Sequence, residues 1–223
     1  MVDENLLQYL EEFVTEKRRQ TFNEVISNRT RHFTVVLENI FQSHNASAVV
    51  RSCDVFGIQD VHTIENSYIN KVSRKIAKGS QKWLDFHRFK DENSNTKDCF
   101  NALKSKGYQI IATTPHNDSC YLSDFDITKK SAFVFGVERE GVSDFMLENA
   151  DGYLKIPMVG FTESLNISVA AAIILQDVTT RLRKSEINWQ LTEEEKNETY
   201  AKWIESSIKN LEKHKSFYYS QKN

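Results

Sequence analysis

The sequence predicts an α/β fold, in which a mostly parallel sheet is flanked by helices and a further helical extension follows at each end. Between about residues 31 and 183, short apolar runs alternate with stretches of helical periodicity, which is typical of a parallel sheet covered on both faces. Outside that region, apolar residues recur at helical spacing. The 223 residues are therefore expected to form a helical extension at 1–30, a core at 31–183 and a helical extension at 184–223.

The first extension and the first half of the core give four expected elements. Residues 5–20 place apolar side chains on one face of a single amphipathic helix, with mostly charged residues opposite. That apolar face consists of Leu6, Leu10, Phe13 and Val14. The expected elements that follow are a strand at Thr34–Leu37, a helix from about Asn45 to Phe56 ended by Gly57, and a strand near Asp60–Ile64.

The second half of the core continues the alternation after a polar loop at Asp91–Lys97. Its expected elements are a helix at Cys99–Lys106, strands at Tyr108–Thr113, Ala132–Phe135 and Tyr153–Ile156, a short helix at about Asp144–Asn149 and a helix from about Asn166 to Arg183. In the last extension, Thr192 and Glu195 have the spacing of a capping box that begins a final helix. The apolar stripe of that helix comprises Tyr200, Trp203, Ile204, Ile208 and Leu211.

Composition favours a soluble protein in a reducing compartment. Hydrophobic residues make up 39% and charged residues 27%, and no apolar run approaches the roughly 20 residues of a membrane span. The acidic, amphipathic N-terminus does not read as a secretory signal. Three cysteines lie far apart and match no metal spacing, and the six histidines are scattered. We therefore expect a cytoplasmic protein with no metal and no membrane partner.

A basic segment points to RNA, although the net charge of −2 does not. Residues 71–90 carry seven basic side chains against one acidic side chain, Asp85. Charge runs alone more often mark a solvated face, but here Trp83 and Phe86 lie among the charges and offer surfaces on which bases stack. The candidate RNA-binding residues are Lys71, Arg74, Lys75, Lys78 and Lys82.

Two polar loops are expected to emerge from one edge of the buried sheet, as a small-molecule pocket requires. The first, Gly136–Gly141, follows an apolar strand and contains Glu138; its glycines allow close approach of a ligand. The second, Gly160–Ser168, opens an apolar helix and contains Ser164 and Asn166, whose side chains can bind a hydroxyl group. Each loop alone has a plainer interpretation, as a turn with incidental acids and as a helix N-cap.

A third segment, Asn45–Arg51, adds two further candidates. Asn45 is well suited to cap the helix that follows. Arg51 interrupts an apolar run and forms a polar stripe with Ser47 and Asp54. A surface pair between Arg51 and Asp54 is one interpretation, and a guanidinium directed at a phosphate is the other.

Together and in this order, these segments closely resemble the SPOUT superfamily of RNA methyltransferases, and within it the TrmH-type tRNA guanosine 2′-O-methyltransferases. The three family motifs correspond to Asn45–Arg51, Phe135–Gly141, and Ile156–Met158 continuing through Ser164–Ser168. The similarity also runs through residues 28–31, 79–83 and 189–193, so it covers nearly the whole chain.

The resemblance implies a fold and a ligand that no spacing argument predicts. The C-terminal part of the sheet region would form a trefoil knot, whose loops bind S-adenosylmethionine. Carried over residue by residue, the cofactor-binding positions are Thr113, Gly136, Ile156, Met158 and Leu165. The protein would act as a homodimer with its active site at or near the subunit interface.

The implied reaction is attack of a ribose 2′-hydroxyl on the sulfonium methyl group. The expected target is the tRNA D-loop guanosine at position 18. The neutral leaving thioether needs no acid, so catalysis requires deprotonation and alignment of the hydroxyl. The catalytic positions are Asn45, Arg51, Glu138, Ser164 and Asn166. Because arginine stays protonated in proteins, Arg51 is expected to clamp an RNA phosphate, while Glu138 is the carboxylate available to orient groups or assist proton removal.

Three alternatives remain. A ribosomal-RNA 2′-O-methyltransferase would share the core, although helices at both ends and no separate N-terminal RNA-binding domain favour tRNA. A non-catalytic RNA-binding paralogue would not be expected to carry all five catalytic positions. A dinucleotide-binding α/β domain would carry a glycine fingerprint, GxGxxG, which this chain lacks.

Overall fold

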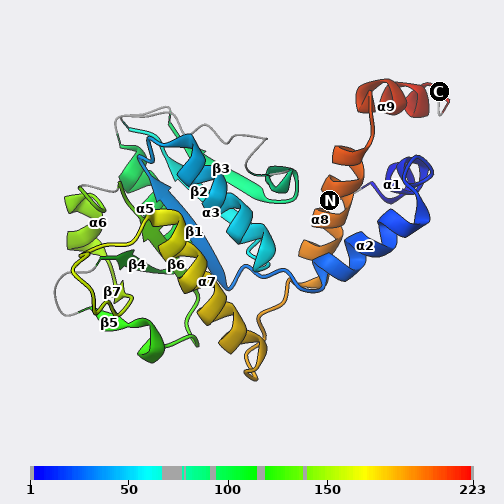
Figure 1. The fold of residues 1–223 in the computed structure, drawn as a ribbon. Coiled ribbons are helices and arrows are strands. Elements are labelled where there is room, and N and C mark those ends of the chain that lie inside the picture. The colour runs from blue at the N-terminus through cyan, green and yellow to red at the C-terminus, as the bar shows by residue number, and fades with distance from the viewer. Residues whose placement is uncertain are drawn as a thin grey trace. The chain divides into compact units, whose positions relative to one another are not determined.

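The computed structural model describes residues 3–66, 77, 79–90, 94–114, 119–137 and 140–221. The chain divides into two compact units (Figure 1). The larger unit is Thr30–Trp189 and contains the sheet; the smaller is helical and combines Met1–Arg29 with Gln190–Asn223, from the two ends of the chain. In the described residues, no helix is long and apolar enough to cross a membrane.

The described strands of the larger unit form one seven-stranded sheet in the order β3-β2-β1-β6-β4-β7-β5. All of their pairings are parallel. The strands are β1 (Phe33–Glu38), β2 (Asp60–Ile64), β3 (Asp85–Phe89), β4 (Gln109–Thr113), β5 (Cys120–Tyr121), β6 (Ser131–Phe135) and β7 (Gly152–Lys155). The predicted α/β fold with a mostly parallel sheet flanked by helices is confirmed.

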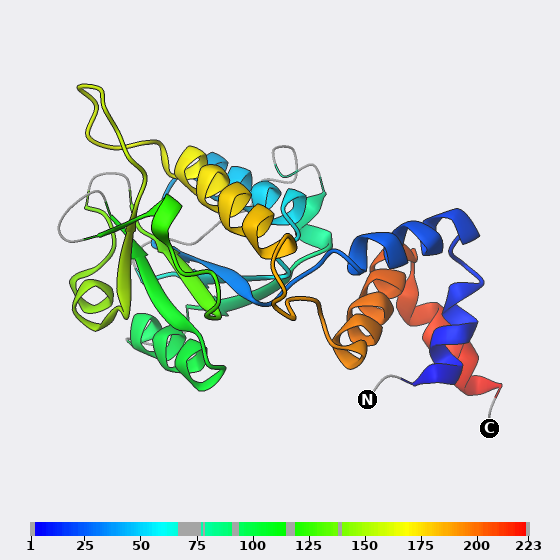
Figure 2. The ribbon, with the colours of Figure 1, turned by 90° about the horizontal axis from the view of Figure 1, so that it is seen from below.

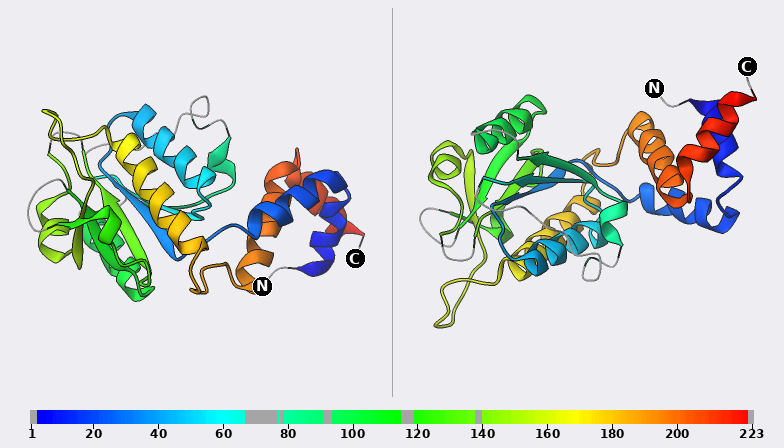
Figure 3. Two further views of the ribbon diagram at one scale, coloured as in Figure 1. Left: turned by 60° about the horizontal axis from the view of Figure 1, so that its bottom comes forward. Right: turned by 90° about the horizontal axis from the view of Figure 1, so that it is seen from above.

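The central strands are apolar throughout because both of their faces are buried. Alternate side chains point to opposite faces of a strand, so Val35 and Leu37 join one hydrophobic cluster while Val36 joins the other. Helices α3 (Ser43–Val55) and α7 (Ile167–Arg183) pack on the first face, and α5 (Asn95–Ser105) and α6 (Asp144–Asn149) cover the second. Figures 2 and 3 show these two helical layers with the sheet between them.

Two strands were not predicted from the sequence. β3 lies within the basic segment, at the edge of the sheet, and its side chains are only partly buried. Its register with β2 pairs Asp60 with Asp85, and it alternates Phe86 with charged or polar neighbours instead of forming an apolar run. β5 has two residues, too few for any periodicity. The short 3₁₀ turns η1 (Ser80–Lys82) and η2 (Leu122–Asp124) were also not predicted.

The single helix expected over residues 5–20 is wrong. The structure has α1 (Glu4–Glu11) and α2 (Glu16–Ile26). Asp3 caps α1 by accepting hydrogen bonds from two backbone N–H groups, and the chain turns before Thr15 begins α2.

The single final helix is also wrong, because α8 (Glu193–Ser207) and α9 (Leu211–Ser220) are separated at Asn210, which has a left-handed φ of 55°. The capping box of Thr192 and Glu195 is confirmed at the start of α8. Helix α5 begins at Asn95, inside the expected polar loop.

A partly buried ionic cluster lies where β1, β2 and β3 begin. Arg31 donates from Nε to Asp60 Oδ2 at 3.0 Å and from Nη2 to Asp85 Oδ2 at 2.7 Å. His87 Nε2 lies 3.1 Å from Asp60 Oδ1, and its ring stacks on His62 with centroids 4.5 Å apart. Burial, reinforced by the neighbouring His87, lowers the pKa of His62 to about 3, so His62 is neutral in the folded protein at neutral pH.

Candidate active site

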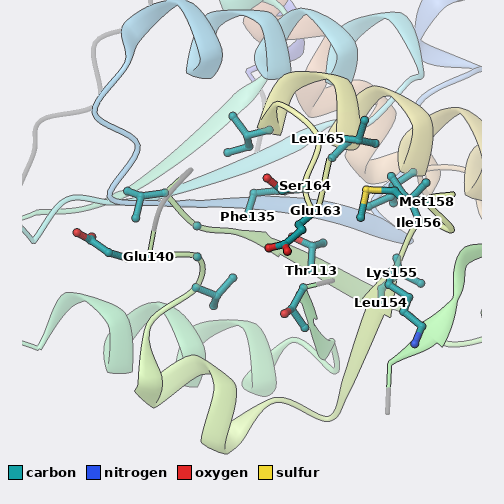
Figure 4. Close-up of a pocket in the computed structure, with 18 of the residues that line it drawn as sticks. Thr113, Phe135, Glu140, Leu154, Lys155, Ile156, Met158, Glu163, Ser164 and Leu165 are labelled. Atoms are coloured by element: carbon teal, nitrogen blue, oxygen red, sulfur yellow. The ribbon is translucent and has the colours of Figure 1, made fainter. Parts of the chain in front are cut away.

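A cavity of about 350 Å³ opens at the carboxyl edge of the sheet, beside the ends of β4, β6 and β7. This is the edge at which parallel α/β sheets bind ligands. All five residues that the family resemblance assigns to the cofactor line it, namely Thr113, Gly136, Ile156, Met158 and Leu165. In Figure 4 Glu163, Ser164 and Leu165 lie above Thr113, and Ile156 and Met158 lie at one end of the site. The role of the five residues as cofactor ligands stays a prediction.

The described ends of the first loop of the cavity are joined by an antiparallel bridge between Val137 and Gly141. Val137 N donates to Gly141 O, and Gly141 N donates to Val137 O, both at 2.9 Å. A Cβ added to Gly136 would lie 1.8 Å from Gly141 O, so only glycine fits there. Gly141 has a φ of 73°, which also favours glycine. Glu138, predicted within this loop, lies outside the described residues.

The second loop connects β7 to α7, and Asn166 is its last residue. Asn166 Oδ1 accepts from the backbone N–H of Ser168 at 2.8 Å and from its Oγ at 2.7 Å, which caps α7. At the same time Asn166 Nδ2 donates to Asn45 Oδ1 at 3.1 Å. The N-cap interpretation of this segment is therefore confirmed, and the same side chain also reaches α3. Ser164, in the same loop, is exposed and lines the cavity.

The sequence suggested that Asn45 caps α3, but it does not. The helix begins at Ser43 with Gln42 as its N-cap residue, and Asn45 lies inside the first turn. Its amide is buried, donates from Nδ2 to Gln42 Oε1 at 2.9 Å and accepts from Asn166. Two predicted catalytic positions, 121 residues apart in the chain, are thus brought into hydrogen-bond contact.

The other predicted positions are less closely gathered. Arg51 is exposed on α3 and is not among the residues that line the cavity. Lys82 is exposed at the end of η1. The other four basic candidates, Lys71, Arg74, Lys75 and Lys78, lie outside the described residues. Within the described ranges, no group of three or more His, Cys, Asp or Glu side chains could hold a metal ion.

Three charged side chains that the sequence did not single out also line the cavity: Glu140, Lys155 and Glu163. In Figure 4 Glu163 lies next to Ser164 near the centre of the site, and Glu140 lies at the end away from Met158. Glu163 directly precedes Ser164, so its position within the polar loop was a usable signal. The lining thus combines apolar walls with a few polar and charged groups, which is the character of a small-molecule site.

Comparison with known proteins identifies the family. Residues 32–176 match the SpoU rRNA Methylase family, a span that runs from the start of β1 into α7. The chain belongs to the SpoU rRNA methylase family. It is 40% identical, over 91% of its own length and 91% of the relative's, to the tRNA (guanosine(18)-2′-O)-methyltransferase of Borreliella burgdorferi. The matched span includes both cavity loops and Asn45, which sets aside the dinucleotide-binding alternative.

Solved structures of the SpoU family share the fold. The crystal structure of the A. aeolicus TrmH/SpoU tRNA modifying enzyme superposes with a TM-score of 0.77 at 32% identity, covering 87% of this chain and 98% of that one. The SpoU methyltransferase AviRb from Streptomyces viridochromogenes, in complex with AdoMet, gives a TM-score of 0.61 at 24% identity, over 73% of this chain and 65% of that one. At that identity the second likeness concerns the fold alone.

Proposed function

We propose that this SpoU-family chain transfers a methyl group from S-adenosylmethionine to the ribose 2′-hydroxyl of guanosine 18 in tRNA. One observation carries the proposal: the cavity lined by the five expected cofactor positions occurs in a chain 40% identical to an enzyme of that name across 91% of both lengths. A tRNA substrate in turn supports a cytoplasmic location.

The residues of the cavity fit a nucleoside-containing cofactor. Its volume of about 350 Å³ falls within the usual range of small-molecule pockets, and its walls combine Leu154, Ile156 and Leu165 with the hydroxyl of Thr113. The absence of a side chain at Gly136 lets Gly141 and Val142 pack against it, and the backbone of all three residues lines the cavity. S-adenosylmethionine, when bound, supplies an electrophilic methyl group whose leaving thioether is neutral.

The remaining chemistry falls to side chains that align and deprotonate the hydroxyl. The Asn45–Asn166 pair is held in place by Gln42 and by the start of α7, so it can present amide groups to a ribose with little loss of side-chain freedom. Ser164 lines the cavity and offers a hydroxyl group beside it. Arg51, exposed on the same helix as Asn45, is suited to a phosphate, and Glu138 is proposed from the sequence as the carboxylate of the site.

The proposal includes a homodimer with the active site near the subunit interface. Apolar side chains gather, exposed, on the loop before α7 and on the outer face of α7; they are Met158, Val159, Phe161, Leu165, Val169 and Ile173. Figure 2 shows this loop projecting from the sheet. Two members of this apolar patch, Met158 and Leu165, also line the cavity, so a second copy seated there would adjoin the cofactor site.

The dimer is tested by Ile173→Asp against Val25→Asp. Both residues lie on helices and both are 37% exposed, but Val25 belongs to the smaller unit. A charge within a buried interface is costly, so Ile173→Asp is expected to give a monomer in sedimentation equilibrium while Val25→Asp remains dimeric. A wild-type chain that is monomeric, or an Ile173→Asp variant that dimerises normally, contradicts the proposed interface.

Two further parts of the proposal come from the family resemblance. The C-terminal part of the sheet region is proposed to be threaded into a trefoil knot. The core at 31–183 is proposed to carry the cofactor and the chemistry, with the helical extensions at 1–30 and 184–223 contributing to tRNA binding.

Mass-spectrometric mapping of ribose methylation tests the activity. The chain is incubated with S-adenosylmethionine and, in separate reactions, unmodified tRNA or ribosomal RNA; a matched tRNA with deoxyguanosine at position 18 serves as the control. Methylation at position 18 that disappears in the control is the expected result. Methylation of ribosomal RNA alone supports the ribosomal alternative, and cofactor and RNA binding without methylation supports the non-catalytic one.

A further inference from the structure

Glu38, the last residue of β1, is a buried carboxylate to which the predicted site gives no role. It is 2% exposed and accepts three hydrogen bonds from two other segments of the chain. Ser143 donates its backbone N–H to Oε2 at 2.9 Å and its hydroxyl to Oε1 at 2.8 Å. Thr96, in α5, donates its hydroxyl to Oε1 at 3.1 Å. Hydrogen bonds to a charged acceptor are stronger than neutral ones, so this carboxylate is a firm attachment point.

This attachment fixes the end of the first cavity loop to β1. Where the loop begins, Phe135 pairs with Leu37 in the sheet register. Where it ends, Ser143 is held by the side chain of Glu38, the residue next to Leu37. Both ends of the segment Gly136–Ser143 are therefore fixed to two consecutive residues of β1. The described ends of the loop are thus held in place without any contact from a ligand.

A second set of contacts fixes the carboxylate itself. Thr96 Oγ1 also accepts from Asn66 Nδ2 at 2.8 Å, and the backbone N–H of Asn66 donates to Asn39 Oδ1 at 2.8 Å. Asn39, directly after Glu38, adopts a left-handed φ of 54°. This network joins the ends of β1 and β2 to α5, and it leaves the Glu38 carboxylate little freedom to turn away from Ser143.

The burial of Glu38 is not explained by an ion pair. Among the described residues, no basic side chain forms a salt bridge with it, and Cys99 lies close enough that burial together with the Glu38 charge raises the pKa of the Cys99 thiol. Burying a charge is costly unless donors surround it, and an apolar residue would often serve stability as well. The buried carboxylate is therefore better explained by the position it gives to Ser143 and the loop than by a gain in stability.

We propose that Glu38 is a positioning residue that holds the described ends of the first loop, 136–137 and 140–143, in the arrangement that binds the cofactor, an inference that rests on the proposed function. Glu38 does not line the cavity and acts through Ser143. The carboxylate is needed because three donors face it; an amide offers one oxygen and turns its own N–H groups toward a donor. Weakening the attachment lowers the fraction of molecules with the loop ends in this arrangement, and the apparent cofactor affinity falls by that fraction.

The test compares Glu38→Gln with Ser143→Ala and with a matched control, Glu65→Gln. Glu65 is also a buried glutamate at the carboxyl end of a neighbouring strand, but it accepts a hydrogen bond from Thr63 and pairs with Arg88 at 3.9 Å. S-adenosylmethionine binding is measured by calorimetry on the full chain, and tRNA binding by filter titration. We expect Glu38→Gln to raise the Kd for S-adenosylmethionine by about tenfold, Ser143→Ala to raise it less, and the double variant to add little to Glu38→Gln. Glu65→Gln leaves that Kd unchanged, and all variants leave the Kd for tRNA unchanged.

The outcomes separate this inference from the proposed function. If the wild-type chain binds S-adenosylmethionine and Glu38→Gln binds it equally well, the positioning role is overturned. If Glu38→Gln does not fold, Ser143→Ala carries the same decision, because it removes one of the two bonds from Ser143. If the wild-type chain does not bind the cofactor, the proposed function fails instead. Hydrogen exchange at Val137 and Gly141 then decides the inference: faster exchange in Glu38→Gln supports it, and unchanged exchange overturns it.

Discussion

Substituting Gly136 by alanine perturbs the cavity at its most tightly packed point. The added Cβ would lie 1.8 Å from the carbonyl oxygen of Gly141, 2.1 Å from its carbonyl carbon and 2.4 Å from the backbone nitrogen of Val142. All three atoms are backbone atoms and cannot turn aside as a side chain would. The loop has to move by more than an ångström before the closest contact reaches 3.0 Å, the limit for real Cβ atoms.

That movement breaks the bridge between Val137 and Gly141. The two hydrogen bonds between Val137 and Gly141 are worth about 0.5–1.5 kcal/mol each, and forcing extra volume into a packed site costs about 1–3 kcal/mol. Holding the loop at the cavity with these hydrogen bonds lost and the methyl group accommodated therefore costs about 2–6 kcal/mol. Because the loop lies at the edge of the sheet, we expect most molecules to open the loop and to keep the core intact. Even about 2 kcal/mol reduces cofactor affinity by about 30-fold.

Calorimetric titration with S-adenosylmethionine measures the effect, with Gly160→Ala as the matched control. A Cβ on Gly160, in the second loop, would have no heavy atom within 4 Å. We expect Gly136→Ala to raise the Kd by at least about 30-fold, and Gly160→Ala to change it by no more than about twofold. Wild-type affinity in Gly136→Ala, with an unchanged melting temperature, refutes the reasoning, because it means that the loop in solution lacks the bridge described here.

Three further predictions concern RNA, catalysis and pH. Arg51→Ala is expected to abolish methyl transfer but to leave cofactor binding nearly intact, and near-wild-type turnover in a radiolabelled methyl assay contradicts its phosphate role. Neutralising Lys75, Lys78 and Lys82 together should weaken RNA binding and flatten its salt dependence; an unchanged slope in filter binding excludes the segment. Because the pKa of His62 is about 3 when folded and 6.5 in the reference state, the unfolded chain binds the extra proton between these values. The stability that neutral His62 confers is complete above pH 6.5 and falls toward pH 3, by up to about 5 kcal/mol. In urea unfolding, the free energy of unfolding of His62→Gln should therefore fall less steeply with pH than that of the wild type. An equal fall in both proteins contradicts the prediction.

The parts of the fold that could be predicted are those with local patterns. Apolar runs identify β1, β2, β4, β6 and β7 because the middle of a parallel sheet is buried on both faces. β3 escaped prediction because an edge strand in a basic segment carries Asp85 and Arg88 and is only partly buried. The breaks within both helical extensions depend on short turns, at Thr15 and Asn210, that leave the amphipathic pattern nearly continuous.

The site was predictable only as far as its contacts are local or carried by family motifs. The five cavity residues came from the resemblance; pattern alone gave two polar loops at one edge. The capping role expected for Asn45 was wrong because α3 begins two residues earlier. Glu38 was not predicted, since its partner Ser143 lies 105 residues away and nothing beside Glu38 in the sequence indicates the contact. Long-range hydrogen bonds of this kind have no signature in a single sequence.

The contrast between buried and exposed groups leads to one more expectation, that the two halves of the site respond to different changes. On the cofactor side, the first loop is attached to β1 through Glu38 and the sheet register. On the side proposed for RNA, Arg51 and Lys82 are exposed. Pre-organised contacts raise affinity because little freedom is lost on binding, whereas exposed side chains must be ordered by the RNA or by a second subunit. Changes to the loop attachment should therefore act on the Kd for S-adenosylmethionine, and changes to the exposed basic groups should act on turnover and tRNA binding.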